Sequence, residues 1–77
     1  NLTIFPSPAS SNMTVSLDGI KGNNRCQIYS LTGKKVLEFV LENNTRTLDV
    51  SNLANGTYIL AVNTGQGAVK QSFVIMK

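Results

Sequence analysis

Residues 53–62, with the sequence LANGTYILAV, constrain the fold of this chain more than any other stretch. Their turn ends in Gly56, and glycine adopts positive φ values at little cost because it lacks a Cβ atom. The backbone is therefore able to reverse direction at Gly56. After the reversal, every second residue from Tyr58 to Val62 falls on the same face, as in a strand that buries one side. We expect a sharp turn that leads directly into a half-buried β-strand.

The spacing of the tyrosine adds a second constraint. Tyr58 follows Leu53 by five residues, with Gly56 between them. In immunoglobulin-like β-sandwiches, a tyrosine near the start of a strand bonds through its hydroxyl to backbone a few residues upstream, an arrangement called the tyrosine corner. The sequence therefore predicts that Leu53, Gly56 and Tyr58 form such a corner.

Short alternating segments, separated by turn residues, recur along the rest of the chain. The expected strands are residues 2–5, 13–18, 25–30, 35–41, 45–50, 58–62 and 68–76, with a last hairpin turn at 63–67. Pro6 and Pro8 end the first strand, because proline cannot donate to a β-ladder, and Gly33 suits the positive φ of a hairpin turn. No segment has convincing helical periodicity. The pattern predicts an all-β fold, a seven-stranded antiparallel immunoglobulin-like β-sandwich.

Length and composition indicate one folded domain. The 77 residues suffice for one core and leave no room for a second. An apolar fraction of 42% against 14% charged residues is typical of a folded domain rather than a disordered one. No apolar run approaches the roughly 20 residues of a transmembrane helix. Because Asn1 almost directly precedes a predicted strand, we expect residues 1–77 to be a domain of a longer chain.

Residues that carry catalysis or bind metals are scarce. Histidine, the usual acid or base near neutral pH, is absent. The carboxylates Asp18, Glu38, Glu42 and Asp49 lie on different predicted strands and turns and form no paired or ligand-spaced motif. Cys26 is the only cysteine, so it has no disulfide partner, and without a histidine to activate it we expect a small buried side chain. The sequence predicts no enzyme, no cofactor and no metal site.

The charge distribution argues against nucleic-acid binding. The net charge is +3, and the lysines and arginines are dispersed along the chain, with only Lys34 and Lys35 adjacent. Nucleic-acid binding usually needs a clustered basic face, often with aromatic residues for single strands. We therefore expect a solvated surface and no nucleic-acid partner.

The last predicted strand departs from the pattern of a self-contained sandwich. Residues 73–76 are all apolar, whereas a sandwich strand buries one face and is polar on the other. Either Phe73 and Ile75 face the core and Val74 and Met76 point outward, or the reverse. Such exposed apolar surface suits strand addition by a partner. The alternatives are that a loop covers it or that the terminus frays.

Four segments together resemble one family. FPSPAS at 5–10, IYSLTGK at 28–34, DVSNLANGTY at 49–58 and KQSFVIMK at 70–77 fall in the order and spacing of the type A C-terminal sorting domains of the type IX (Por) secretion system of Bacteroidetes. The family usually opens on Tyr-Pro-Asn-Pro-Ala-Ser and carries Ile-Tyr-Asp-Leu-Thr-Gly-Lys at its centre, so Phe5, Ser7 and Ser30 are departures from it. The resemblance covers nearly the whole chain.

This resemblance implies a folded secretion signal that performs no chemistry itself. It would direct an N-terminal cargo domain, by way of the periplasm, through the outer-membrane type IX secretion machinery to the cell surface or the medium. A sortase-like peptidase would then commonly remove the domain. We expect the last strand to present the recognition surface, formed by Lys70, Phe73, Val74, Ile75, Met76 and Lys77.

Two other functions fit a small β-sandwich. One is a carbohydrate- or surface-binding module, which usually exposes aromatic side chains at its site. The absence of tryptophan and the presence of only two tyrosines count against it. The other is a structural spacer between domains.

Overall fold

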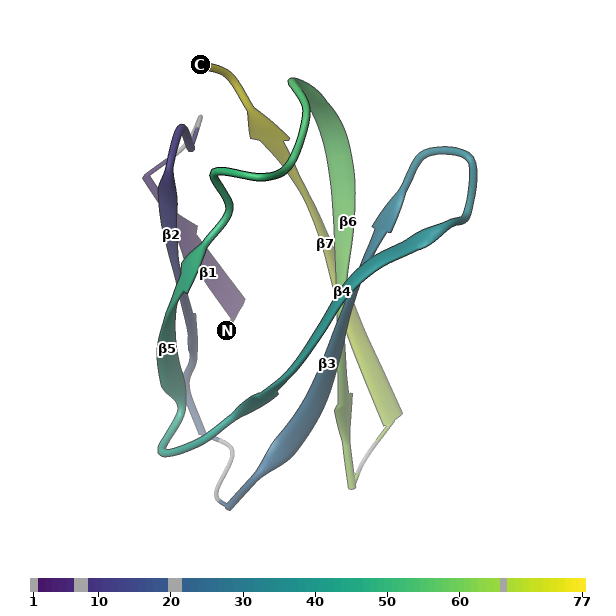
Figure 1. The fold of residues 1–77 in the computed structure, drawn as a ribbon. Coiled ribbons are helices and arrows are strands. Elements are labelled where there is room, and N and C mark those ends of the chain that lie inside the picture. Colours follow the sequence, from purple (N-terminus) through teal and green to yellow (C-terminus); the bar gives the residue numbers. More distant parts are fainter. Residues whose placement is uncertain (1, 7–8, 20–21, 66) are drawn as a thin grey trace.

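The computed structural model of the protein describes residues 2–6, 9–19, 22–65 and 67–77, which form two antiparallel sheets packed face to face (Figure 1). One sheet has the strand order β1-β2-β5 and the other the order β4-β3-β6-β7. The strands are β1 (Leu2–Phe5), β2 (Asn12–Leu17), β3 (Asn24–Ser30), β4 (Lys35–Leu41), β5 (Thr45–Asp49), β6 (Gly56–Thr64) and β7 (Gly67–Ile75). The described residues contain no helix, and the predicted all-β sandwich of seven antiparallel strands is confirmed.

The last hairpin differs from the sequence-based prediction. A broad turn was expected at 63–67, but β6 and β7 pair without interruption as far as Thr64 and Gly67. Val50, expected at the end of the fifth strand, lies just after β5 and is nevertheless buried. Turn residues such as asparagine, threonine and glycine mark the ends of strands only loosely, because tertiary pairing overrides their local preference.

The core lies between the two sheets and follows the alternation of the strands. In β2, Met13, Val15 and Leu17 point inward, and each is at most 3% exposed. Cys26 and Ile28 of β3 face them with no exposed surface. Burying a side chain of this kind contributes about 1.5–3 kcal/mol, so the alternating pattern supplies the main stabilisation of a domain without a disulfide.

The predicted tyrosine corner is present. The hydroxyl of Tyr58 donates a hydrogen bond of 2.7 Å to the backbone carbonyl of Ala54. Gly56 has a φ of 153°, in the region that favours glycine. Leu53 packs against the core, and its amide bonds to the carbonyl of Val50. The corner therefore fixes the connection between β5 in one sheet and β6 in the other.

Two further turns were marked by glycine or proline. Gly33 has a φ of 91°, and its amide donates to the carbonyl of Ser30 within the β3–β4 hairpin, as predicted. Pro6 follows β1 directly, after a cis peptide bond with Phe5. Pro8 lies outside the described residues.

An arginine joins the two sheets at the side where β4 and β5 are neighbours along the chain. Nη1 of Arg46 donates to the carbonyl of Val40 at 2.9 Å, and its guanidinium lies 5.9 Å from the ring centroid of Phe39. The guanidinium thus covers an aromatic ring of the core and also bonds the backbone of β4.

Candidate recognition strand

The structure decides between the two orientations of the last strand. Phe73 and Ile75 face the core and are 5% and 1% exposed, whereas Met76 is 60% exposed. Val74 is half-buried on the outer face, and Lys70 is exposed. Of the residues predicted to form a recognition surface, Phe73 and Ile75 therefore fix the strand in place, and the others are accessible from solvent.

Phe73 connects this strand to the tyrosine corner. Its ring stacks on Tyr58, with centroids 5.8 Å apart and an interplanar angle of 23°. The two residues are opposite each other in the β6–β7 register. Because stacked aromatic pairs contribute beyond their buried area, the corner and the end of β7 form one packed unit.

The outer edge of β7 is partly covered by a residue that sequence reasoning missed. The amide of Ala9 donates to the carbonyl of Val74 at 3.0 Å, and its carbonyl accepts from the amide of Met76 at 2.8 Å. Ala9 is 1% exposed and forms an isolated parallel bridge with Ile75. A lone alanine after two prolines carries no sequence signal for this contact, which depends on the three-dimensional position of the first turn.

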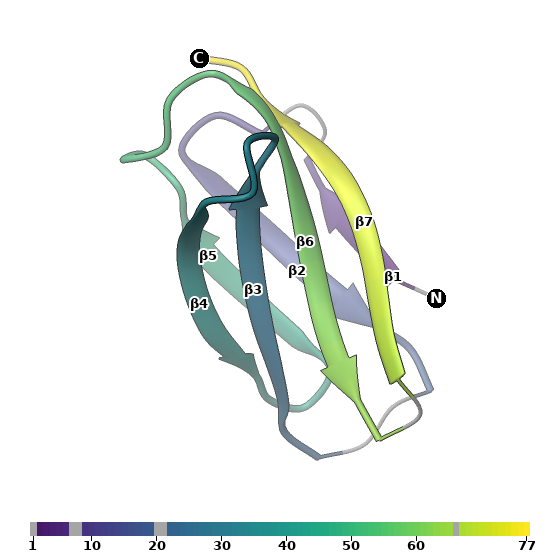
Figure 2. The same ribbon diagram turned by 90° about the vertical axis from the view of Figure 1, so that its right-hand side faces the viewer.

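The carboxyl-terminal tail is held by the loop that precedes the corner, and both lie at one end of the sandwich (Figure 2). The amide of Lys77 donates to Oδ1 of Asn55 at 3.0 Å, and its ammonium group donates to the carbonyl of Ser51. Asp49 accepts hydrogen bonds from the hydroxyl and the amide of Ser51, which hold the pKa of its carboxyl below the ordinary value. Tail and loop are therefore positioned together.

A row of polar side chains crosses the outer face of the larger sheet. Asn63 donates to Gln27 at 2.9 Å, Gln27 donates to Glu38 at 3.5 Å, and Lys35 forms a 3.1 Å ion pair with Glu38. The hydrogen bond from Lys35 is the main cause that holds the pKa of Glu38 below its ordinary value. The row joins β4, β3 and β6 and stops before β7, so it leaves Lys70 out of the network.

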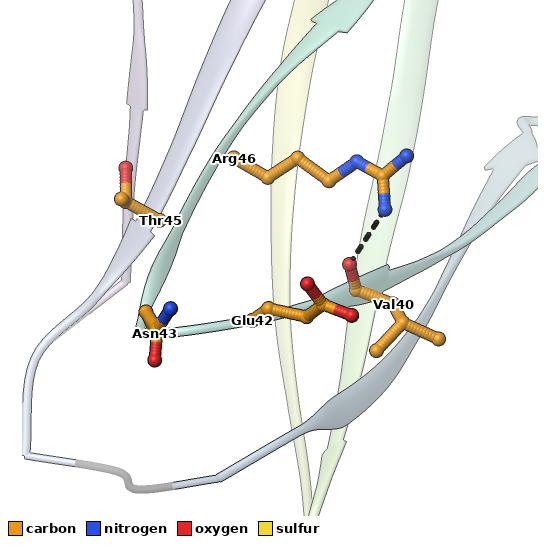
Figure 3. Close-up of a pocket in the computed structure, with 5 residues that line it drawn as sticks. All are labelled: Val40, Glu42, Asn43, Thr45 and Arg46. Carbon is orange, nitrogen blue, oxygen red and sulfur yellow. Dashed lines mark hydrogen bonds between the residues drawn. The ribbon is translucent and has the colours of Figure 1, made fainter.

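A solvent-open hollow of about 430 Å³ lies at the β4–β5 turn (Figure 3), at the end of the molecule opposite to the carboxyl-terminal tail (Figure 1). Its lining residues are Val40, Glu42, Asn43, Thr45 and Arg46. They offer one carboxylate and one guanidinium, and the guanidinium already donates to the backbone of β4. This set contains no nucleophile activated by a neighbouring base.

The thiol of Cys26 has no exposed surface, and its burial raises its pKa to about 11 from the ordinary value of 9.0. We therefore expect no alkylation of the native protein by iodoacetamide at mildly alkaline pH, and complete alkylation after unfolding. Fast alkylation of the native protein contradicts this prediction.

The raised pKa of Cys26 also makes the stability of the domain depend on pH. The folded state keeps the thiol protonated, whereas in the unfolded chain the thiol ionises near pH 9.0. The associated stability is thus complete below pH 9.0 and is lost as the pH rises to about 11. Denaturant titrations of wild type and Cys26→Ala across this range measure the difference in the free energy of unfolding. A difference that does not change with pH contradicts the prediction.

Two further findings concern metals and membranes. Within residues 2–6, 9–19, 22–65 and 67–77, no three histidine, cysteine, aspartate or glutamate side chains gather closely enough to hold a metal ion. The same part of the chain contains no helix of the length and apolar character needed to span a membrane.

Comparison with known proteins identifies the family. The model of the family described as "Secretion system C-terminal sorting domain" matches residues 3–76, which is nearly the whole chain. No curated protein matches the chain. The matched range covers the four segments that carry the resemblance, except for Lys77. This chain belongs to the C-terminal sorting domains of the type IX secretion system and is a sorting signal for export to the cell surface or the medium.

Proposed function

We propose that this domain directs a cargo protein, attached on its amino-terminal side, through the periplasm to the type IX machinery in the outer membrane. The end of β7 and the tail carry the recognition, and a sortase-like peptidase then removes the domain. The observation that carries the proposal is the accessibility of Lys70 on β7 and of Met76 and Lys77 directly after it, while Phe73 and Ile75 fix the strand into the core. A surface held in this way is available to a partner without unfolding of the domain.

Two features of the structure support a role for the tail end of the sandwich. Met76 is a large apolar side chain that is 60% exposed, and methionine is enriched in protein interfaces relative to the rest of the surface. The tail is ordered by Asn55 and Ser51, which lowers the entropy that a partner must remove on binding. The family is a sorting signal and is not known as catalytic, which agrees with a domain that a peptidase acts on.

The test uses residues 1–77 fused to a periplasmic reporter in a host with a working type IX system. Deleting residues 73–77 is expected to abolish appearance of the reporter in the medium or at the surface. The double variant Met76→Ser/Lys77→Gln is expected to reduce it by roughly 5–30-fold, which corresponds to a combined contribution of about 1–2 kcal/mol from the two exposed residues to binding. The secreted and cell-associated fractions are measured by immunoblot.

Leu31→Ser serves as the matched control. Leu31 is 69% exposed in the turn after β3, so the substitution removes a comparable exposed apolar side chain away from the tail. Its secretion is expected to equal that of the wild type. Undiminished secretion after deletion of residues 73–77 would contradict the role given to the last strand.

A further inference from the structure

The first six residues of β7 extend beyond the cover of the smaller sheet. Residues 67–72 are all exposed, although Leu60, Ala61 and Val62, opposite them in β6, are at most 6% exposed. Figure 2 shows β7 at the outer flank of its sheet, with the four-residue strand β1 behind it. This part of β7, residues 67–72, is therefore paired to β6 along one edge and reachable by solvent along the other.

The direction of the free backbone groups follows from the contacts at the end of β7. The carbonyl of Val74 and the amide of Met76 point away from β6, toward Ala9. The β6–β7 register runs without a bulge, and in an antiparallel ladder the backbone groups of every second residue point to the same side. The amides and carbonyls of Ala68, Lys70 and Ser72 thus also point outward. Among the described residues, no backbone hydrogen bond reaches this edge before Val74.

The other edge strands are shorter or blocked. β1 has four residues and β5 has five. β4 is longer, but it contains a register shift and a Lys35–Glu38 ion pair, and Arg46 occupies the carbonyl of Val40. Bulges, charged side chains and capped carbonyls all hinder pairing with another strand. The free edge of β7 at residues 67–72 is the edge best suited to receive another strand.

The charge of Lys70 determines which kind of partner strand fits the edge of β7. Lys70 is the only charged residue in the sequence of β7, and β6 has none. A second copy paired antiparallel about the centre of this edge would place Lys70 opposite the same lysine, and directly opposed like charges destabilise a sheet. A partner strand with a carboxylate on the same face would instead pair with Lys70, which the polar row does not reach and which forms no ion pair with the described residues.

We propose that the free edge of β7, at Ala68, Lys70 and Ser72, accepts an extended strand of a partner protein that carries an acidic residue opposite Lys70. The inference rests on the proposed function, because it specifies how the last strand of the sorting signal meets its partner. The backbone of Ala68 and Ser72 provides the pairing, and Lys70 provides the selectivity.

The test is a nuclear magnetic resonance titration of the 77-residue chain with the peptide TVTETVT and its counterpart TVTKTVT, each up to millimolar concentration. We expect saturable shifts of the amides of Ala68, Lys70 and Ser72, with the acidic peptide bound about two- to fivefold more tightly. Lys70→Glu is expected to reverse that preference. Ser72→Pro removes an outward amide while leaving the bonds to β6 intact, and it should abolish binding of both peptides. Ser72→Ala keeps the amide and should bind like the wild type.

Several results would overturn the inference. They are the absence of saturable shifts, shifts confined to β1, β4 or β5, or a peptide preference that Lys70→Glu leaves unchanged. The reporter fusion separates this inference from the proposed function. If deletion of residues 73–77 blocks secretion and Ser72→Pro does not, the inference is wrong and the sorting role stands. If neither change affects secretion, the role given to the last strand is wrong, and the titration alone decides whether the edge of β7 binds an extended strand.

Discussion

Replacing Tyr58 with alanine is expected to destabilise the domain by about 3–5 kcal/mol, the usual cost of removing a buried aromatic side chain. The ring is 7% exposed and stacks on Phe73, with centroids 5.8 Å apart. Its hydroxyl donates to the carbonyl of Ala54 at 2.7 Å. The substitution leaves a cavity beside Phe73 and at the same time removes the bond that closes the corner.

The size of this effect is large relative to the domain. At about 0.05–0.15 kcal/mol per residue, a chain of this length has a free energy of unfolding of roughly 4–12 kcal/mol. A loss of 3 kcal/mol lowers the melting temperature by at least about 12 °C. Calorimetry or thermal circular dichroism of the purified chain measures the shift.

Tyr58→Phe is the matched variant for the hydroxyl. It keeps the stack on Phe73 and removes only the hydrogen bond to Ala54, so we expect a loss of about 1 kcal/mol. Tyr29→Ala removes the other tyrosine, which is half-buried near the end of β3, and should cost less than Tyr58→Ala. A melting temperature that Tyr58→Ala leaves unchanged would refute the structural role of the corner.

Much of the fold could be predicted from the sequence, because the signals involved are local. Alternation in residues such as Met13, Val15 and Leu17 depends only on the period of a strand, and a positive φ at Gly33 depends only on the absence of a Cβ atom. The corner at Tyr58 spans five residues and was predicted for the same reason. Local pattern, turn chemistry and burial agree along most of the chain.

The remaining features depend on contacts between distant residues. The bridge from Ala9 to β7 joins segments more than sixty positions apart, and the bond from Lys77 to Asn55 joins the tail to a loop before β6. The sequence left open which face of the last strand points inward, because residues 73–76 are apolar on both faces. The burial of Phe73 and Ile75 between the two sheets decides it. The surface available to a partner therefore could not be predicted from the sequence alone.

We expect the secretion machinery to recognise the folded domain rather than the linear sequence of its tail. Leu60→Asp tests this. Leu60 has no exposed surface and lies in the middle of the larger sheet, between Ile28 and Gln71 in the register. An unpaired buried carboxylate costs several kcal/mol, which is comparable to the whole stability of a domain of this size. The variant should be unfolded while residues 70–77 keep their sequence, and secretion of the reporter is expected to fall to the level of the deletion of residues 73–77.

Leu60→Met is the conservative variant, since a volume-conserving apolar exchange in a core usually costs less than about 1.5 kcal/mol. It should fold and be secreted like the wild type. An immunoblot of the cell-associated fraction verifies that the Leu60→Asp fusion accumulates, so that a loss of export is not mistaken for degradation. Export of accumulated Leu60→Asp at the wild-type level would mean that a linear tail suffices. Lys70, Met76 and Lys77 would then be recognised as parts of a linear sequence, and their positions on the folded surface would have no effect on export. If Leu60→Asp loses export while Leu60→Met keeps it, recognition is assigned to the folded surface that the tyrosine corner and Phe73 hold in place.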